Sequence, residues 1–429
     1  MIALIFVTLA VGFPIALSIG VGSTAALYII MPQAGAFMVA AQKMFQSVNS
    51  FSLLAIPFFV MSGSIMNYGG IADKLMDFAE IITGHMRGGL AQVNVVLSML
   101  MGGCSGSANA DCAMQSKMLV PEMEKRGYSK AFAAAVSAAS SAATPVIPPG
   151  VNLVVYTLIA QASLGRTFAA GYIPGFLMSG AMMITTAIIA KKRNYPTTRD
   201  KFPPWGEVFK QAFISFWGLF FPFGIIIGMR LGMFTPSEGG AFACLYCVIV
   251  GKFIYKKLSF REHMVPILME SIAGTSSVVL IMVAANVFGN YLSWINLPKI
   301  VAAGILELTQ NKYVFLMLTN VVLLVMGMFL EGGAALMIIT PLLLPVAKQL
   351  GVDVIHFGLV AIVNIMIGGL TPPFGSMMFT VCGITKCPIS EFLKEVWPYI
   401  LCLFLVLILL TFCPKLITFL PDLLYGAAP

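Results

Sequence analysis

Two stretches decide the fold: Ala-Thr-Pro-Val-Ile-Pro-Pro-Gly at 143–150 and Leu-Thr-Pro-Pro-Phe-Gly at 370–375. Each lies inside a long apolar run and combines a Thr-Pro step, a Pro-Pro step and a closing glycine. Proline removes a backbone N–H donor and clashes with the preceding helical turn, so a regular helix cannot continue through either stretch. We therefore predict two apolar helices that are each broken midway.

Both stretches belong to an internal repeat. Four features recur at a nearly constant offset of 222 to 227 residues: Thr144-Pro145 as Thr371-Pro372, Phe13-Pro14 as Thr235-Pro236, a polar interruption at Gly102 as one at Gly327, and an amphipathic stretch at 71–82 as one at 298–308. Such a constant offset predicts two halves that contain the same elements in the same order.

The composition places both halves in a membrane. Of 429 residues, 59% are hydrophobic and 10% are charged, whereas soluble chains are about one quarter charged. A polytopic, all-α membrane protein is predicted. A secreted disulfide scaffold, a nucleic-acid binder and a soluble enzyme are excluded as classes.

The apolar stretches are counted in units of about 20 residues, the length that crosses a bilayer. Nine fit one crossing each: 1–30, 51–68, 131–163, 168–190, 211–229, 237–254, 266–292, 355–382 and 396–420. Two more, 88–118 and 313–347, are too long for one crossing and are interrupted by small and polar residues. We predict that each forms a helical hairpin.

Basic residues decide how the hairpins enter the membrane. Region 88–118 has basic residues at both ends, namely Arg87, Lys117, Lys125 and Arg126. Short basic loops stay in the cytoplasm, so this hairpin is predicted to re-enter from inside, and counting the spans places 313–347 as re-entering from outside. Inverted repeats with broken helices are typical of secondary transporters, whose site lies near mid-membrane.

The breaks and hairpin tips offer suitable chemistry. Unwound helices expose carbonyl oxygens, which bind hard cations such as sodium, and half-helix N-termini favour an anion. An ionisable residue at membrane depth is costly and usually functional, which singles out Asp111. The polar residues beside the breaks and tips form the predicted substrate-binding set: Asn109, Asp111, Asn152, Glu331, Asn364 and Ser376.

At this point a family resemblance is recognisable. The whole chain resembles the large membrane subunit of a TRAP (tripartite ATP-independent periplasmic) transporter. The resemblance rests on these motifs in combination: Gly12-Phe13-Pro14, Ile56-Pro57-Phe58-Phe59 with Ser62-Gly63, the tip Gly102–Asp111, Pro148-Pro149-Gly150, Phe234-Thr235-Pro236-Ser237-Glu238 and Leu370-Thr371-Pro372-Pro373.

The resemblance implies an elevator-type transporter in the bacterial inner membrane, driven by sodium ions and without an organic cofactor. It implies two protein partners, a small four-helix membrane subunit and a periplasmic substrate-binding protein, and an organic-anion substrate, with sialic acid favoured and a four-carbon dicarboxylate next. It also implies sodium ligands at each tip and its unwound partner: Ser105, Ser107, Thr144 and Pro145, then Gly327, Gly332, Thr371 and Pro372.

The expected organisation has six segments. Scaffold spans and an interfacial arm helix occupy 1–87, the first hairpin and broken helix 88–163, further scaffold spans 164–265, a scaffold span and second arm helix 266–312, the second hairpin and broken helix 313–385, and a last span 386–429. The two hairpin segments are expected to form one transport domain.

Two other functions fit parts of the sequence. Gly103-Cys104-Ser105-Gly106 matches a nucleophile motif, so an intramembrane serine protease that uses Ser105 is an alternative, although such chemistry needs a histidine at membrane depth. Two hairpins that meet mid-membrane could also line a channel. A flux that is saturable and coupled to sodium would exclude the channel.

Overall fold

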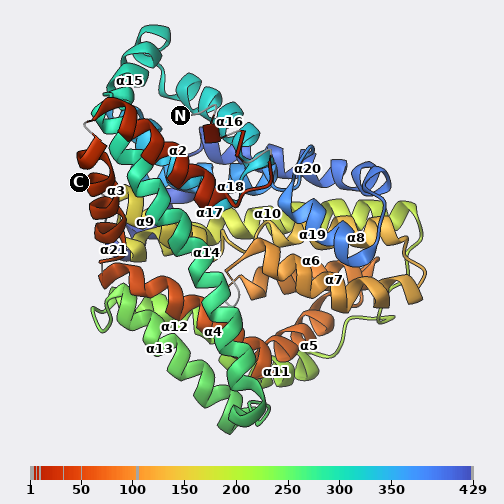
Figure 1. The fold of residues 1–429 in the computed structure, drawn as a ribbon. Helices are drawn as coiled ribbons and strands as arrows, with labels where there is room; N and C mark the ends of the chain where they lie inside the picture. The colour runs from red at the N-terminus through yellow and green to blue at the C-terminus, as the bar shows by residue number, and fades with distance from the viewer. Residues whose placement is uncertain are drawn as a thin grey trace.

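The computed structural model describes residues 4–5, 7–8, 11–31, 33–49, 51–102 and 106–426, and the regular elements within these ranges are all helices (Figure 1). The first half of the chain contains α2 (Ile15–Ile30), α3 (Gln33–Val48), the 3₁₀-helix η1 (Phe51–Leu54), α4 (Ala55–Tyr68), α5 (Ile71–Thr83), α6 (Gly89–Met101), α7 (Ala108–Lys125), α8 (Lys130–Ser141), α9 (Val151–Ala160) and α10 (Leu164–Lys192).

Two helices connect the halves, α11 (Trp205–Ile214) and α12 (Phe216–Arg230). The second half contains α13 (Pro236–Ile249), the π-helix η2 (Val250–Ile254), α14 (Phe260–Trp294), α15 (Leu297–Leu308), α16 (Lys312–Phe329), α17 (Gly332–Gln349), α18 (Val354–Gly368), α19 (Ser376–Thr385), α20 (Ile389–Phe412) and α21 (Lys415–Tyr425).

The helices confirm the predicted repeat. Matching helices start 223 to 225 residues apart: α6 at Gly89 and α16 at Lys312, α9 at Val151 and α19 at Ser376, and α10 at Leu164 and α20 at Ile389. Both predicted breaks are present, because no helix covers the residues between α8 and α9 or between α18 and α19. The Pro148–Pro149 and Pro372–Pro373 peptide bonds are both cis.

Both hairpins are also present, with one adjustment. Helices α6 and α7 form the first, and α16 and α17 form the second. The second hairpin breaks at Leu330 and Glu331, whereas Gly327 lies inside α16. Gly327 serves packing there: a Cβ would lie 2.8 Å from the Ile365 carbonyl oxygen and 3.1 Å from the Gly368 Cα, so only glycine lets α16 approach α18 this closely.

The two halves interlock. Helix α7 of the first half packs on α19 of the second, and α17 of the second packs on α9 of the first (Figure 1). From α9 the Tyr156 hydroxyl donates a hydrogen bond to the Val354 carbonyl of α18, and the Tyr156 ring covers Gly358, where a Cβ would lie 2.1 Å from the ring. Helices α6–α9 and α16–α19 therefore form one packed unit, which we call the hairpin unit.

Several predicted spans differ in the structure. The stretch 1–30 is not one helix, because the chain turns at Gly12, with φ of +94°, before α2 begins at Ile15. The stretch 211–229 is bent: α11 and α12 meet at an angle of 61°, and at the bend the Ser215 hydroxyl donates to the Lys74 carbonyl oxygen of α5 over 2.7 Å. Helix α3, which carries Lys43, was not predicted.

Among the described residues, six helices are long and apolar enough to cross a membrane, or seven if α11 and α12 count as one bent span. Helices α16 and α17 are among the six, although the repeat assigns them to a hairpin. Each break divides one path through the bilayer between two helices, α8 with α9 and α18 with α19. Each of these four helices is therefore shorter than a full crossing. Helices α5 and α15 occupy the two amphipathic stretches, 71–82 and 298–308, where the arm helices are expected.

The opposite entry of the two hairpins is directly testable. Lys125, Thr197 and Asn311 are all exposed, so a cysteine at each can react with a reagent that does not cross the membrane. In a variant without the exposed Cys413, we expect labelling at 125 and 197 only from the cytoplasmic face and at 311 only from outside. Labelling of 125 and 311 from the same side would contradict the inverted topology.

Candidate functional site

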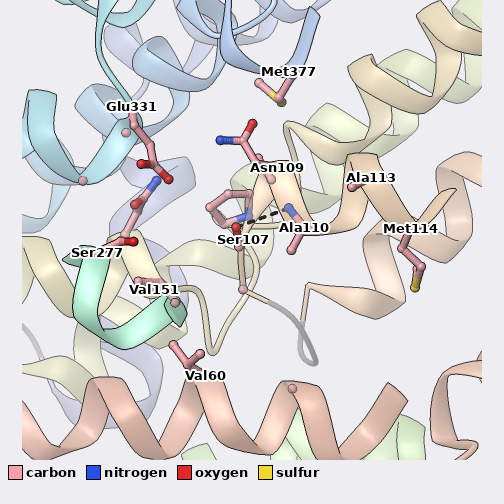
Figure 2. Close-up of a pocket in the computed structure, with 18 of the residues that line it drawn as sticks. Val60, Ser107, Asn109, Ala110, Ala113, Met114, Val151, Ser277, Glu331 and Met377 are labelled. Atoms are coloured by element: carbon pink, nitrogen blue, oxygen red, sulfur yellow. Dashed lines mark hydrogen bonds between the residues drawn. The ribbon is translucent and has the colours of Figure 1, made fainter. Parts of the chain in front are cut away.

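A cavity of about 810 Å³ lies where the hairpin tips and broken helices meet the long helices outside the hairpin unit (Figure 2). One wall comes from the hairpin unit: the start of α7, the start of α9, the tip between α16 and α17, and the start of α19. The other wall comes from α4, α5 and the middle of α14. Both halves of the repeat therefore contribute to a single cavity.

The first tip docks on the first break. The backbone N–H of Val151 donates to the Gly106 carbonyl oxygen over 3.2 Å. Ser107 caps α7 and accepts a hydrogen bond from the Ala110 N–H over 3.4 Å. Ser107 and Asn109 both line the cavity, and the Asn109 Oδ1 is buried without a protein partner in the structure (Figure 2). The positive end of α7 thus faces the cavity, where an anion is favoured.

The second tip docks beside the same break. Gly332 lies against Asn152 of α9, since a Cβ there would be 2.5 Å from the amide Nδ2. Figure 2 shows the Glu331 side chain directed into the space that also contains Ser277 of α14 and Asn109 of α7. The contact between Gly332 and Asn152 is part of the packing of α17, in the second half, on α9, in the first half.

The structure brings only part of the predicted set to the cavity. Seven predicted residues line it: Ser107, Asn109, Pro145, Asn152, Glu331, Gly332 and Ser376. Thr371 and Pro372 lie in the second break, and Thr371 is buried and donates to the Ile367 carbonyl oxygen over 2.8 Å. Ser105 lies outside the described residues.

Asp111 does not line the cavity but lies behind it in a buried network. Its Oδ2 accepts three hydrogen bonds, from the Ser98 hydroxyl at 2.8 Å, the Gln115 amide at 2.9 Å and the Thr144 hydroxyl at 2.9 Å. Its Oδ1 is buried and has no protein partner in the structure. Asp111, whose exposed fraction is 1%, thereby connects both helices of the first hairpin to the first break.

Two partners of Asp111, Ser98 and Gln115, were not among the predicted site residues. Ser98 of α6 and Gln115 of α7 face it, and Asn94 continues the network by donating to the Ser137 hydroxyl over 2.7 Å. The signal was present in the sequence, because Asn94 and Ser98 are four residues apart in a mostly apolar helix and so share one face.

Asn364 of α18 lies in a separate buried network in the second half. Its amide donates to the backbone carbonyl and to the side-chain oxygen of Asn320, both over 2.9 Å, and the Asn320 amide donates to the Thr411 hydroxyl over 3.0 Å. It joins α18 to α16 and α20 and does not line the cavity, so its contact with a transported solute is not supported by the geometry.

Two hairpins, two broken helices and one shared cavity define an inverted-repeat membrane transporter. The chain belongs to the family described as "Tripartite ATP-independent periplasmic transporter, DctM component", whose model matches residues 2–416. It is a multi-pass protein of the bacterial inner membrane and, as that description states, one component of a tripartite transporter.

Relatives match over nearly the whole chain. The chain is 37% identical to "Uncharacterized protein YgiK" of Salmonella typhimurium over 97% of this chain and 95% of that protein. It is 36% identical to the sialic acid TRAP transporter large permease protein SiaM of Vibrio cholerae over 99% and 97%. Other relatives are named for C4-dicarboxylate or 2,3-diketo-L-gulonate transport. The relatives that are named for a substrate are transporter permeases and not enzymes, which overturns the protease alternative.

The fold also matches a solved structure. The crystal structure of the Alcanivorax borkumensis YdaH transporter, described as having an unusual topology, superposes with a TM-score of 0.63 over 89% of each chain. The identity is 14%, so this likeness concerns the fold alone.

Proposed function

We propose that this permease carries a small organic anion inward together with sodium ions, by an elevator movement of the hairpin unit. The single cavity that contacts both tips, both breaks and the helices outside the hairpin unit carries this proposal. A solute held there lies at the boundary between two bodies, so sliding one body against the other moves the solute between the two sides of the membrane.

The moving body would be the hairpin unit, residues 88–163 and 313–385. The scaffold would comprise residues 1–87, 164–265, 266–312 and 386–429, with α5 and α15 as the arms. Helix α14 supports this division, because its 35 residues extend for about 52 Å, more than a bilayer core, and its middle lines the cavity.

Sodium would bind at each break. At the first, the Thr144 hydroxyl lies 2.9 Å from Asp111 Oδ2, so a carboxylate stands next to the unwound backbone and can balance a cation. At the second, the Thr371 hydroxyl donates to a backbone carbonyl, which leaves its oxygen lone pairs free for an ion. We also place ion ligands at the backbone of Pro145 in the first break, Pro372 in the second break and Gly332 at the second tip. The proposed ligands from the first tip are Ser105 and Ser107.

We expect Thr371→Val and Thr144→Val to raise the sodium concentration needed for half-maximal uptake in proteoliposomes. Valine keeps the shape of threonine but removes the oxygen, which should cost on the order of 1–3 kcal/mol at each site. Thr380→Val is the control, because Thr380 also donates to a carbonyl of its own helix but lies outside the cavity lining. Uptake without sodium dependence in the unaltered protein would refute the coupling.

The partners proposed are a small four-helix membrane subunit and a periplasmic binding protein that delivers the anion. Sialic acid is the favoured anion because the SiaM relative matches nearly end to end, with a four-carbon dicarboxylate next.

Reconstitution tests the need for partners. We expect no appreciable uptake by this chain alone in proteoliposomes, and uptake only when both partners are added. The longest loop between described helices, residues 193–204, is too short to form a domain that captures a dilute solute. Saturable uptake by the chain alone would refute this dependence.

A further inference from the structure

The charge of the cavity is unexpected for an anion transporter. Three carboxylates line it, from Asp73, Glu270 and Glu331, and among the described residues Lys117 is the one basic side chain in the lining. An anion that leaves the hairpin tips therefore has to pass a wall that repels it, unless Lys117 compensates.

Lys117 lies well below the tip. It is on α7, ten residues after Ser107, which places it about 15 Å farther along the helix axis. It therefore lies on the part of α7 that leads toward Lys125 and Arg126. Under the topology proposed here, this is the cytoplasmic end of the cavity.

The two carboxylates at that end are already engaged. Glu270 Oε1 accepts the Tyr68 hydroxyl over 2.8 Å, and Asp73 Oδ2 pairs with the Lys257 ammonium over 2.7 Å. Lys117 is exposed and forms no ion pair within the described part of the chain, whereas Lys125 on the same helix pairs with Glu122 over 3.5 Å. Its charge is therefore available to a ligand.

We propose that Lys117 forms a second carboxylate-binding site, which receives the acid group of the transported anion after it leaves the hairpin tips and before it enters the cytoplasm. The proposal rests on the function proposed above. An ammonium on a flexible stem can follow a carboxylate over several ångströms, so it suits a transient site better than a rigid one.

The test separates charge from shape at one position. Lys117→Cys is treated either with 2-aminoethyl methanethiosulfonate, which attaches an ammonium, or with 2-sulfonatoethyl methanethiosulfonate, which attaches a sulfonate. Sodium-dependent binding of radiolabelled N-acetylneuraminate and of succinate is then measured on purified permease, with the unmodified chain given the same reagents to correct for native cysteines.

We expect Lys117→Gln to weaken binding of the better probe about fivefold, the scale of one partly solvated ion pair. The ammonium adduct should restore the lost affinity, and the sulfonate adduct should lower it further. Lys125→Gln, on the same helix but outside the cavity, should bind as the unaltered protein does.

Two outcomes overturn the inference, and a third is distinct. Equal affinity of Lys117→Gln and the unaltered protein, or equal affinity of the two adducts, shows that the charge at 117 does not bind the carboxylate. Absence of sodium-dependent binding of both probes to the unaltered protein instead overturns the proposed function, and this inference with it.

Discussion

Asp111→Asn is expected to abolish sodium-driven uptake at physiological sodium while the protein remains folded. Asparagine keeps an oxygen where Oδ2 accepts from Ser98, Gln115 and Thr144, and its amide nitrogen replaces the Oδ1 that has no protein partner in the structure. The substitution therefore removes the negative charge and preserves the hydrogen-bond geometry. A lost countercharge close to a cation should cost on the order of 2–4 kcal/mol.

The measurement is uptake against sodium concentration, with folding followed by the melting temperature of the purified protein. Ser98→Ala is the matched control, because it removes a neutral donor to the same oxygen but keeps the charge. It should shift the sodium curve much less than Asp111→Asn. Equal shifts in the two variants would mean that Asp111 acts only as a structural acceptor.

Gly150→Ala is expected to prevent formation of the folded transporter. An added Cβ at Gly150 would lie 2.1 Å from the Pro145 carbonyl oxygen and 2.7 Å from its carbon, so it would collide with backbone that cannot rotate away. Overpacking of this kind costs typically 1–3 kcal/mol and more where the backbone itself is struck. Such a loss is a large fraction of the total stability of a folded protein, which is about 5–15 kcal/mol.

Gly375→Ala tests the same geometry in the second half and should be milder. Its added Cβ would lie 2.7 Å from the Gly369 carbonyl oxygen and 2.9 Å from that of Thr371, so a smaller shift relieves the contact. Gly289→Ala in α14, which meets nothing within 4 Å, is the control. The folded fraction is read from the monodisperse peak in size-exclusion chromatography. A normal peak for Gly150→Ala would contradict the packing described for the first break.

The breaks, the repeat and the amphipathic helices α5 and α15 could be predicted because their causes are local. Proline excludes a helix by its own chemistry, and an amphipathic face such as that of Ile71 and Leu75 is written in residue spacing. The contact between Ser98 and Asp111 could not be predicted from the sequence, because Ser98 reaches Asp111 only after the hairpin folds back.

Tertiary contacts also explain the remaining differences. The small and polar residues from 327 to 333 predict that Gly327 belongs to the second tip, yet close packing against α18 keeps Gly327 inside α16. The bend between α11 and α12 occurs at Ser215, whose hydroxyl bonds to a carbonyl 141 residues away in the sequence. No signal near Ser215 in the sequence specifies that partner.

The crossed packing of α7 on α19 and of α17 on α9 has a consequence for biosynthesis. When the ribosome has released the first half, α7 and α9 already exist, but the surfaces that cover them have not been translated. The membrane-insertion machinery must therefore shelter an unfinished hairpin until more than two hundred further residues are made. The same packing bears on descent: a single ancestral half could have covered its own α7 and α9 only by pairing with a second copy inserted upside down.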